Sequence, residues 1–526
     1  MKQIFLITAL IATSCFISCS DEIENINQNP NSPESVLPNL IFNSATKEMM
    51  DNRRNTFGSG RLTLPWMQYW GQNAYADDDR FDYREQVAED HYTDTYKVGT
   101  DLKAIIDFNT DEATRTLAAS VGNNENQIAA ARIMLAYNFH QATDFFGDIP
   151  YYSYGSDDPD FQGLNVDEIF SPVFAPAEKI YADILKELRE SADMIVVSEP
   201  VFTSGDQIFN GDALKWKKFA NSLILRVANR LRNVDPTTAN AAIEAALADG
   251  VMESNEDNAA QAYDVADATA SPIWVDYIGR NDFAVAAPFV KLLKGETGNF
   301  GPDARLFEMA APASVSIEDV KDDSYDRSEN YDDYVGIPYA FQLANFLPFT
   351  SFSWPSSNIL KPDYSEMLME YAEVQFVISE HNGFTQENYE NGVRASMERW
   401  GVAAATVDAF VAGLPAATQE TVMNQKYVAS YMQPHNAWSE YRRTGFPTTL
   451  VKVGETVILP QSQVAALGEN SVPSYEFIPR IPVNDLPTRL RYPQILQTLN
   501  GTNRATAVSK LDDGDTIESK LFWDVN

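Results

Sequence analysis

Cysteine is nearly absent from this chain. Its 526 residues include only Cys15 and Cys19, both at the extreme N-terminus. Without further thiols, the remaining sequence can form neither a disulfide nor a thiolate metal site. We therefore expect packing alone to hold the fold, and a hydrophobic content of 44% in so long a chain supplies an ample core.

Histidine and positive charge are also scarce. The four histidines, at positions 91, 140, 381 and 435, are scattered and show no zinc-site spacing. The 39 basic residues face 75 acidic ones, which gives a formal net charge of −36. Such a field repels nucleic acid and anionic lipid surfaces, so we exclude both as partners. It also disfavours polyanionic ligands unless a local basic pocket overrides it.

Catalytic signatures are missing too. The sequence has no G-x-S-x-G, no P-loop and no G-x-G-x-x-G. With 75 acids, close carboxylate pairs arise by chance and do not indicate a glycosidase. The acidic run "ADDDRFDYREQ" (76–86) lacks the spacing of an EF-hand loop, so we interpret it as a solvated charge run. We expect no enzyme, no cofactor and no metal.

The sequence has a single long apolar run, at residues 4–18, which follows Lys2. It is too short to span a bilayer but has the shape of a secretory signal. We predict a lipoprotein signal peptide (1–18), cut before Cys19, whose thiol takes the lipid. The alternatives are a plain signal peptide, or cleavage at Cys15, which would leave a cramped apolar region. Residues 19–34, rich in Asn and Pro, predict a flexible tether.

From about residue 35 to 250, the apolar residues recur mainly with helical spacing. The segments 125–145, 175–194 and 212–236 carry apolar residues three and four apart; Asp212 can cap the third and Pro236 stop it. Their recurrence favours a helical solenoid of tetratricopeptide type. Between 251 and 355 the chain is acidic, Tyr-rich and irregular, which predicts functional loops. The sequence predicts further helices at 364–383 and 388–401, and loops with short strands in the tail from residue 450.

Aromatic residues form the most informative cluster. In "LPWMQYWGQNAY" (64–75), a helix opened by Pro65 would put Trp66 and Trp70 on one face, with Tyr75 on the following loop. Indole rings stack on the apolar faces of sugars, while nearby polar groups bond the hydroxyls. The alternative is that both tryptophans belong to the core.

Two more tryptophans lie in loop-like sequence. Trp274 and Trp354 stand among Pro and Ser, and Arg280 and Asn281 follow Trp274 closely enough to supply hydrogen bonds. The alternative for Arg280 is a turn with a structural salt bridge. The candidate ligand-binding residues are therefore Trp66, Trp70, Tyr75, Trp274, Arg280, Asn281 and Trp354.

Several segments together resemble the SusD/RagB family of outer-membrane lipoproteins of Bacteroidota. They are "NQNPNSPE", "ARIMLAYNFHQATDFFGDIPY", "WKKFANSLILRVANRLRNVDP", "LKPDYSEMLMEYAEVQFVISE", "AWSEYRRTGFP" and "KLFWD", in family order. The resemblance implies a mainly α fold: one SusD-like domain over 35–526, with a tetratricopeptide-like scaffold (about 35–250 and 360–450) and a loop-rich binding part (about 251–359). It also implies that the Arg pair of "YRRTGFP" is buried against acids, with Gly445 and Pro447 setting a turn.

The same resemblance implies a function. Members are lipid-anchored at the cell surface and cover a SusC-like TonB-dependent transporter, to which they pass oligosaccharides, or peptides in the RagB branch, without cutting them. The acids after Cys19 resemble those of lipoproteins sent to the outer surface. From the net charge we predict a neutral glycan such as a glucan. Peptide capture and, less favoured, a surface hydrolase are the alternatives; two or more exposed indoles in one cleft would favour a glycan over a peptide.

Overall fold

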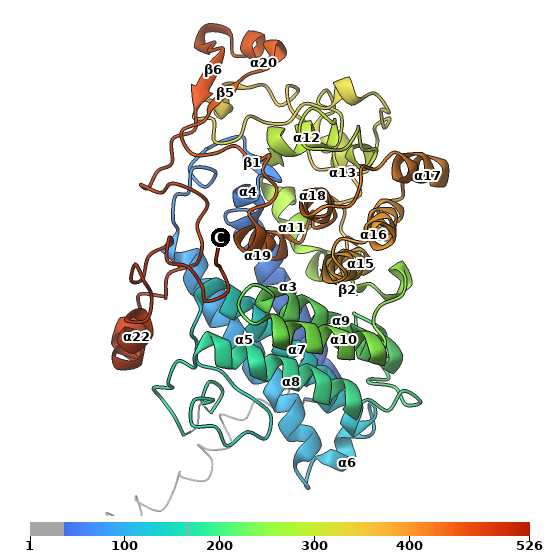
Figure 1. The fold of residues 1–526 in the computed structure, drawn as a ribbon, viewed down its shortest axis with the longest axis vertical. Coiled ribbons are helices and arrows are strands. Elements are labelled where there is room, and N and C mark those ends of the chain that lie inside the picture. Colours follow the sequence, from blue (N-terminus) through green and yellow to red (C-terminus); the bar gives the residue numbers. More distant parts are fainter. Residues whose placement is uncertain (1–35, 166–167) are drawn as a thin grey trace, which may run out of the picture.

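The protein is mainly helical, as predicted, with a few short strands (Figure 1). The structure, a computed structural model, describes residues 36–165 and 168–526. The predicted signal peptide, Cys19 and the tether therefore lie outside the described residues. Within the described ranges, no helix combines the length and apolar character needed to cross a membrane.

The N-terminal half is a stack of long helices in which chain neighbours pack side by side, the arrangement expected of a tetratricopeptide-like scaffold. At its centre, nearly every residue of α7 (Asn124–Phe146) is buried, and its alanines let the surrounding helices approach closely. The helices of this half are α3 (Pro38–Arg54), α4 (Thr63–Trp66), α5 (Glu85–Thr110), α6 (Arg115–Ala118), α7 (Asn124–Phe146), α8 (Ala177–Met194), α9 (Ala213–Leu231) and α10 (Pro236–Asp249).

The predicted cap of α9 is confirmed, but its predicted end is wrong. The side chain of Asp212 accepts a hydrogen bond from the backbone N–H of Lys215 and so satisfies one of the free donors of the first turn. The helix already ends at Leu231. Pro236 instead opens α10, because proline lacks the N–H that the first helical position does not need.

Between residues 251 and 359 the regular elements are short. They are η1 (Asn255–Asp257), β2 (Ala259–Gln261), η2 (Asp267–Thr269), α11 (Pro272–Gly279), β3 (Phe283–Val285), α12 (Ala287–Leu293), α13 (Arg305–Met309), α14 (Ile317–Lys321), η3 (Tyr331–Asp333) and η4 (Ala344–Phe346).

Helices return after residue 370. The helix predicted over 364–383 is shorter than expected, because its first part forms strand β4 (Glu366–Met369). The helices of this part are α15 (Tyr371–His381), α16 (Gln386–Arg399), α17 (Ala404–Ala412), α18 (Gln419–Ala429) and α19 (Pro434–Thr444). The tail holds β5 (Thr456–Ile458), α20 (Gln461–Ala466), η5 (Gly468–Asn470), β6 (Ser474–Glu476), α21 (Leu496–Leu499) and α22 (Gly501–Val508).

The strands pair into small antiparallel sheets that connect distant parts of the chain. Strand β1 (Trp70–Gln72) pairs with β3, so that Trp70 lies opposite Val285 and Gln72 opposite Phe283. Strand β2 pairs with β4, and β5 pairs with β6 in a hairpin beside α20 (Figure 1). The first two pairings join the loop-rich middle to the helical parts.

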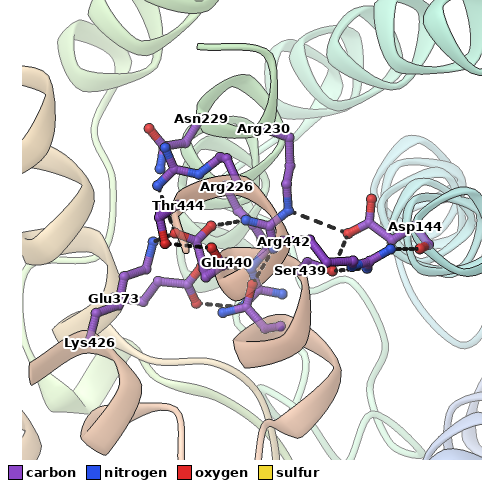
Figure 2. A network of polar contacts seen from close by, with 12 residues as sticks. Asp144, Arg226, Asn229, Arg230, Glu373, Lys426, Ser439, Glu440, Arg442 and Thr444 are labelled. Atoms are coloured by element: carbon purple, nitrogen blue, oxygen red, sulfur yellow. Dashed lines mark hydrogen bonds and ion pairs between the residues drawn. The ribbon is translucent and has the colours of Figure 1, made fainter. Parts of the chain in front are cut away.

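A buried network of charged side chains connects α7, α9, α15 and α19 (Figure 2). Arg226 of α9 binds Glu373 of α15 at 2.6 Å, and Asp144 of α7 accepts a hydrogen bond from the Ser439 hydroxyl of α19 at 2.8 Å. Lys426 of α18 contacts Glu440 at 2.8 Å; burial lowers the pKa of this ammonium to about 7. Charges buried in this way are tolerated only because each finds a partner.

The resemblance implies that the arginine pair of "YRRTGFP" is buried against acids: both arginines are buried, and Arg443 binds a carboxylate, whereas Arg442 binds backbone carbonyls. Arg443 donates to both carboxylate oxygens of Glu380, at 2.7 and 2.8 Å. Arg442 donates to the backbone carbonyls of Asp144 and Thr488. Gly445 ends α19 in the left-handed conformation, at φ 74°, and the Phe446–Pro447 peptide bond that follows is cis.

Candidate functional site

Three of the four candidate tryptophans are core residues, which corrects the expectation that they offer stacking surfaces. Trp66, Trp70 and Trp354 are all buried. Pro65 sits in only a single helical turn, α4, and Trp70 lies on strand β1, so the expected two-indole helix face does not form. The indole N–H of Trp70 donates to the Tyr431 hydroxyl at 2.8 Å, which satisfies it inside the core.

Three of the remaining candidates, Tyr75, Arg280 and Asn281, are brought to the same place by the β1–β3 pairing. Just beyond β1, the backbone N–H of Asn73 donates to the carbonyl of Asp282, and its side-chain amide donates to the carbonyl of Asn281. Tyr75, two residues further on, is 54% exposed. The loop carrying Tyr75 and the Arg280–Asn281 segment before β3 therefore lie at the same end of this small sheet.

Helix α11 presents an apolar stripe to solvent. Its residues Ile273 and Tyr277 are buried, and the Tyr277 hydroxyl donates to the carbonyl of Phe283. On the opposite side Trp274 is half-buried, while Val275 and Ile278 are exposed. Because α11 ends beside Arg280, this stripe adjoins Arg280, Asn281 and the loop that carries Tyr75.

Phe57 extends the same surface and was not found from the sequence. The Asn55 side chain accepts hydrogen bonds from the N–H groups of Phe57 and Gly58, forming a tight turn that leaves Phe57 53% exposed. Asp276 of α11 holds this turn through both the N–H and the hydroxyl of Thr56. A Cβ at Gly58 would lie 2.1 Å from the carbonyl oxygen of Asn52, so this turn requires glycine. The available sequence signal was an aromatic residue inside an Asn–Gly turn.

We call Phe57, Tyr75, Trp274, Val275 and Ile278 the aromatic face. The Arg61 guanidinium lies 4.7 Å from the centre of the Phe57 ring and 3.7 Å from the carboxylate of Asp282. Arg280 binds the same carboxylate at 2.6 Å, so the structural ion pair considered for Arg280 is present. More than half of the Arg280 side chain still faces solvent, which leaves donors beside the apolar surface.

A polar pocket of about 290 Å³ adjoins the aromatic face, because Phe57 also forms part of its wall. Asn52, Asp90 and Asp94 contribute amide and carboxylate groups to the same pocket. An exposed aromatic ring beside polar side chains that can bond hydroxyl groups is an arrangement suited to a small polar ligand with an apolar face.

The acidic run 76–86 is not simply solvated, which corrects the sequence interpretation. Asp78 is buried and binds Arg61 at 2.8 Å and Arg84 at 2.6 Å. Asp79 is buried beside it, and one carboxylate oxygen accepts the N–H of Gln72 at 2.8 Å. Burial raises the pKa of Asp79 to about 8. In the part of the chain that the structure describes, no group of three or more His, Cys, Asp or Glu is placed to hold a metal.

Asp79→Asn is expected to raise the free energy of unfolding by up to about 4 kcal/mol at pH 7, because the folded state must hold a proton that the unfolded state has released. The carboxyl of the unfolded chain ionises above pH 3.8, whereas that of the folded chain keeps its proton until about pH 8. The free energy of unfolding therefore falls as the pH rises from 3.8 to 8. Asparagine keeps the acceptor for Gln72 and cannot ionise. Urea unfolding between pH 5 and 8 checks this, with the partly exposed Asp77→Asn as control. An unchanged pH slope in Asp79→Asn would refute the assignment.

Solved structures share this fold. A chitin-binding protein has a TM-score of 0.71 and 21% identity over 93% of this chain and 100% of its own. A chitin-binding SusD homologue from Flavobacterium johnsoniae has a TM-score of 0.67 and 20% identity over 92% and 99%. A SusD homologue from Parabacteroides distasonis has a TM-score of 0.70 and 20% identity over 93% and 98%. No curated protein is similar enough in sequence to count as a match.

Family models give the more specific result. Residues 30–461 match the SusD-like family described as "Starch-binding associating with outer membrane". Residues 415–524 match the family described as "Susd and RagB outer membrane lipoprotein". The two matches together span almost all of the chain. The chain therefore belongs to the SusD/RagB family of outer-membrane nutrient-binding proteins.

Proposed function

We propose that this protein captures neutral oligosaccharides, first of all a glucan, on the aromatic face. The observation that carries the proposal is the exposure of the Phe57 and Tyr75 rings beside Arg280 and Asn281. An exposed aromatic ring in a family of nutrient-binding proteins offers a surface for the C–H face of a sugar. The adjoining polar groups of Arg280, Asn52 and Asp90 supply donors and acceptors for its hydroxyls.

The preference for a neutral glycan rests on charge. The formal net charge of −36 opposes a polyuronate or a sulfated glycan, and Asp90 and Asp94 add local negative charge beside Phe57. Two of the structural relatives are named as chitin-binding proteins, and chitin is also neutral. Chitin fragments are therefore the second neutral class to test.

The cellular setting is part of the same proposal. Membership in an outer-membrane family supports a lipid anchor at Cys19 and a position on the cell surface. There the protein would hold its ligand and deliver it to a SusC-like TonB-dependent transporter, without cleaving it. Binding without catalysis fits a surface that offers stacking and hydrogen bonding.

Peptide capture, as in the RagB branch, is the second candidate. The burial of Trp66, Trp70 and Trp354 favours it, because two or more exposed indoles in one cleft were expected of a glycan site. That criterion is not met. The glycan proposal rests instead on Phe57 and Tyr75.

Calorimetry with the soluble chain tests the choice of ligand. We expect saturable binding of maltoheptaose, cellohexaose or chitohexaose, and none of an alginate hexasaccharide or of a mixed tryptic peptide digest. Binding of alginate or of peptides without any neutral sugar would overturn the proposal. Measuring new reducing ends after incubation with the bound sugar checks for hydrolysis, and we expect none.

A further inference from the structure

We propose that a second pocket, separate from the aromatic face, also binds a neutral oligosaccharide. This pocket has a volume of about 550 Å³, within the range of about 300–1,000 Å³ typical of small-molecule sites. It lies between the β2–β4 sheet, the segment before β4 and the C-terminal end of α16. The inference goes beyond the proposed function, because it does not require the aromatic face to bind anything.

The walls of this second pocket offer apolar surface. Ala260 of β2 and Met367 of β4 are cross-strand partners, so they line the pocket from the same face of the sheet. Tyr364 and Trp400 also line the pocket, but each is only 5% exposed, so they support its wall and do not offer a stacking surface. The apolar surface open to a ligand comes from Ala260 and Met367, which are partly exposed and can contact the C–H face of a sugar ring.

The charges of the pocket cancel one another. Arg399 pairs with the buried Glu370 at 2.8 Å, and its guanidinium lies 4.1 Å from the centre of the Trp400 ring. Lys361 lies 3.6 Å from the carboxylate of Asp363. A pocket whose cations already have partners does not call for an ionic ligand, and the acidic remainder of the protein disfavours an anionic one.

Several polar groups of the pocket retain hydrogen-bonding capacity. Arg399 uses one nitrogen for Glu370 and another for the Tyr364 hydroxyl at 3.3 Å, which leaves further N–H donors. Ser365 can both donate and accept, and Asp363 accepts. This mixture of donors and acceptors matches hydroxyl groups, which do both, better than it matches a carboxylate or phosphate, which only accept.

The second pocket adjoins the start of α11, whereas Arg280 and the loop that carries Tyr75 lie beyond the end of this helix; of the aromatic face, Trp274 is the residue nearest to the pocket along α11. At the start of this helix, the N–H of Ser271 donates to the carbonyl of Pro362, which lies between the pocket residues Lys361 and Asp363. The aromatic face continues to Arg280, just past the end of the helix. Eight helical residues span about 12 Å, so a short oligosaccharide in the pocket need not touch Phe57 or Tyr75.

The test uses calorimetry and crystals of the full soluble chain with maltoheptaose, cellohexaose and chitohexaose. In a Phe57→Ala/Tyr75→Ala background we expect a residual binding event. Adding Ser365→Trp, which fills the pocket, is expected to weaken that event by at least about tenfold. The matched control Ser462→Trp, exposed in a different groove, is expected to leave it unchanged.

A second variant guards against misfolding caused by the half-buried Ser365→Trp. Lys361 and Asp363 are both exposed, and Lys361→Ala/Asp363→Ala removes polar groups of the pocket without changing its net charge. It too is expected to weaken the residual binding. Absence of residual binding, or residual binding that neither change affects, would overturn the inference. If the second pocket binds sugar and the aromatic face does not, Ser365→Trp alone abolishes all binding. In that case Phe57→Ala/Tyr75→Ala leaves binding unchanged.

Discussion

Phe57→Ala/Tyr75→Ala is expected to weaken binding of the neutral oligosaccharide by at least about 30-fold at the aromatic face, since anchor aromatics contribute about 2 kcal/mol or more. Both rings are more than half exposed, so their removal costs little core packing. The unfolding free energy should therefore stay within about 1 kcal/mol of the original protein. Calorimetric titration and urea unfolding of the same samples measure the two quantities.

A matched control is available in the loop-rich middle of the chain. Phe346 and Phe349 are 47% and 53% exposed, similar to Phe57 and Tyr75, and neither belongs to the aromatic face. Phe346→Ala/Phe349→Ala is expected to leave binding unchanged. An equal loss in both double variants would show that general surface apolarity, rather than the aromatic face, holds the sugar.

Glu380→Ala is expected to lower the free energy of unfolding by about 3–5 kcal/mol, because it leaves buried positive charge without its partner. The carboxylate of Glu380 accepts two hydrogen bonds from Arg443 and one from the side chain of Asn229 at 3.0 Å. Glu398→Ala serves as control: that side chain is half exposed, 4.0 Å from Arg394, and should contribute no more than about 0.5 kcal/mol.

The pH dependence of this pair gives an independent check. Burial alone would raise the pKa of Glu380, but Arg443, Lys426 and Arg232 outweigh it and lower the pKa to about 2. The stabilisation is therefore fully present above the ordinary value of 4.5 and is lost as the pH falls toward 2. The difference in the free energy of unfolding between the original protein and Glu380→Gln, measured in urea, should shrink as the pH falls over that interval. A difference that is constant with pH would contradict the ion pair.

The fold was largely predictable because its helices carry strong local signals. Apolar spacing and the cap at Asp212 located α7, α8 and α9 to within a few residues. The short strands were not predictable in the same way. Residues 364–370 resembled the start of a helix, yet Glu366–Met369 pairs with β2, more than one hundred residues away, and that pairing overrides the local preference.

The candidate site was only half predictable. Tyr75 and Arg280 were found because they stand in loop-like sequence, but sequence could not show that β1 and β3 bring them together. Trp66 and Trp70 were misplaced because their four-residue spacing suggested a helix. The positive φ of Gln68, 54°, instead ends the helical conformation before β1. Phe57 was missed because a single aromatic residue in a turn has no periodic signal. Its exposure depends on the contacts of Thr56, in the turn after α3, with Asp276 of α11.

The most direct test of the central claim is a crystal structure of the soluble chain with a neutral oligosaccharide from the binding panel. We expect a sugar ring stacked on Phe57 or Tyr75, with hydroxyls bonded to Arg280 or to the polar pocket beside Phe57. An aromatic face that is open to solvent in the crystal but carries no sugar, while a sugar is well occupied elsewhere on the same molecule, would contradict this expectation.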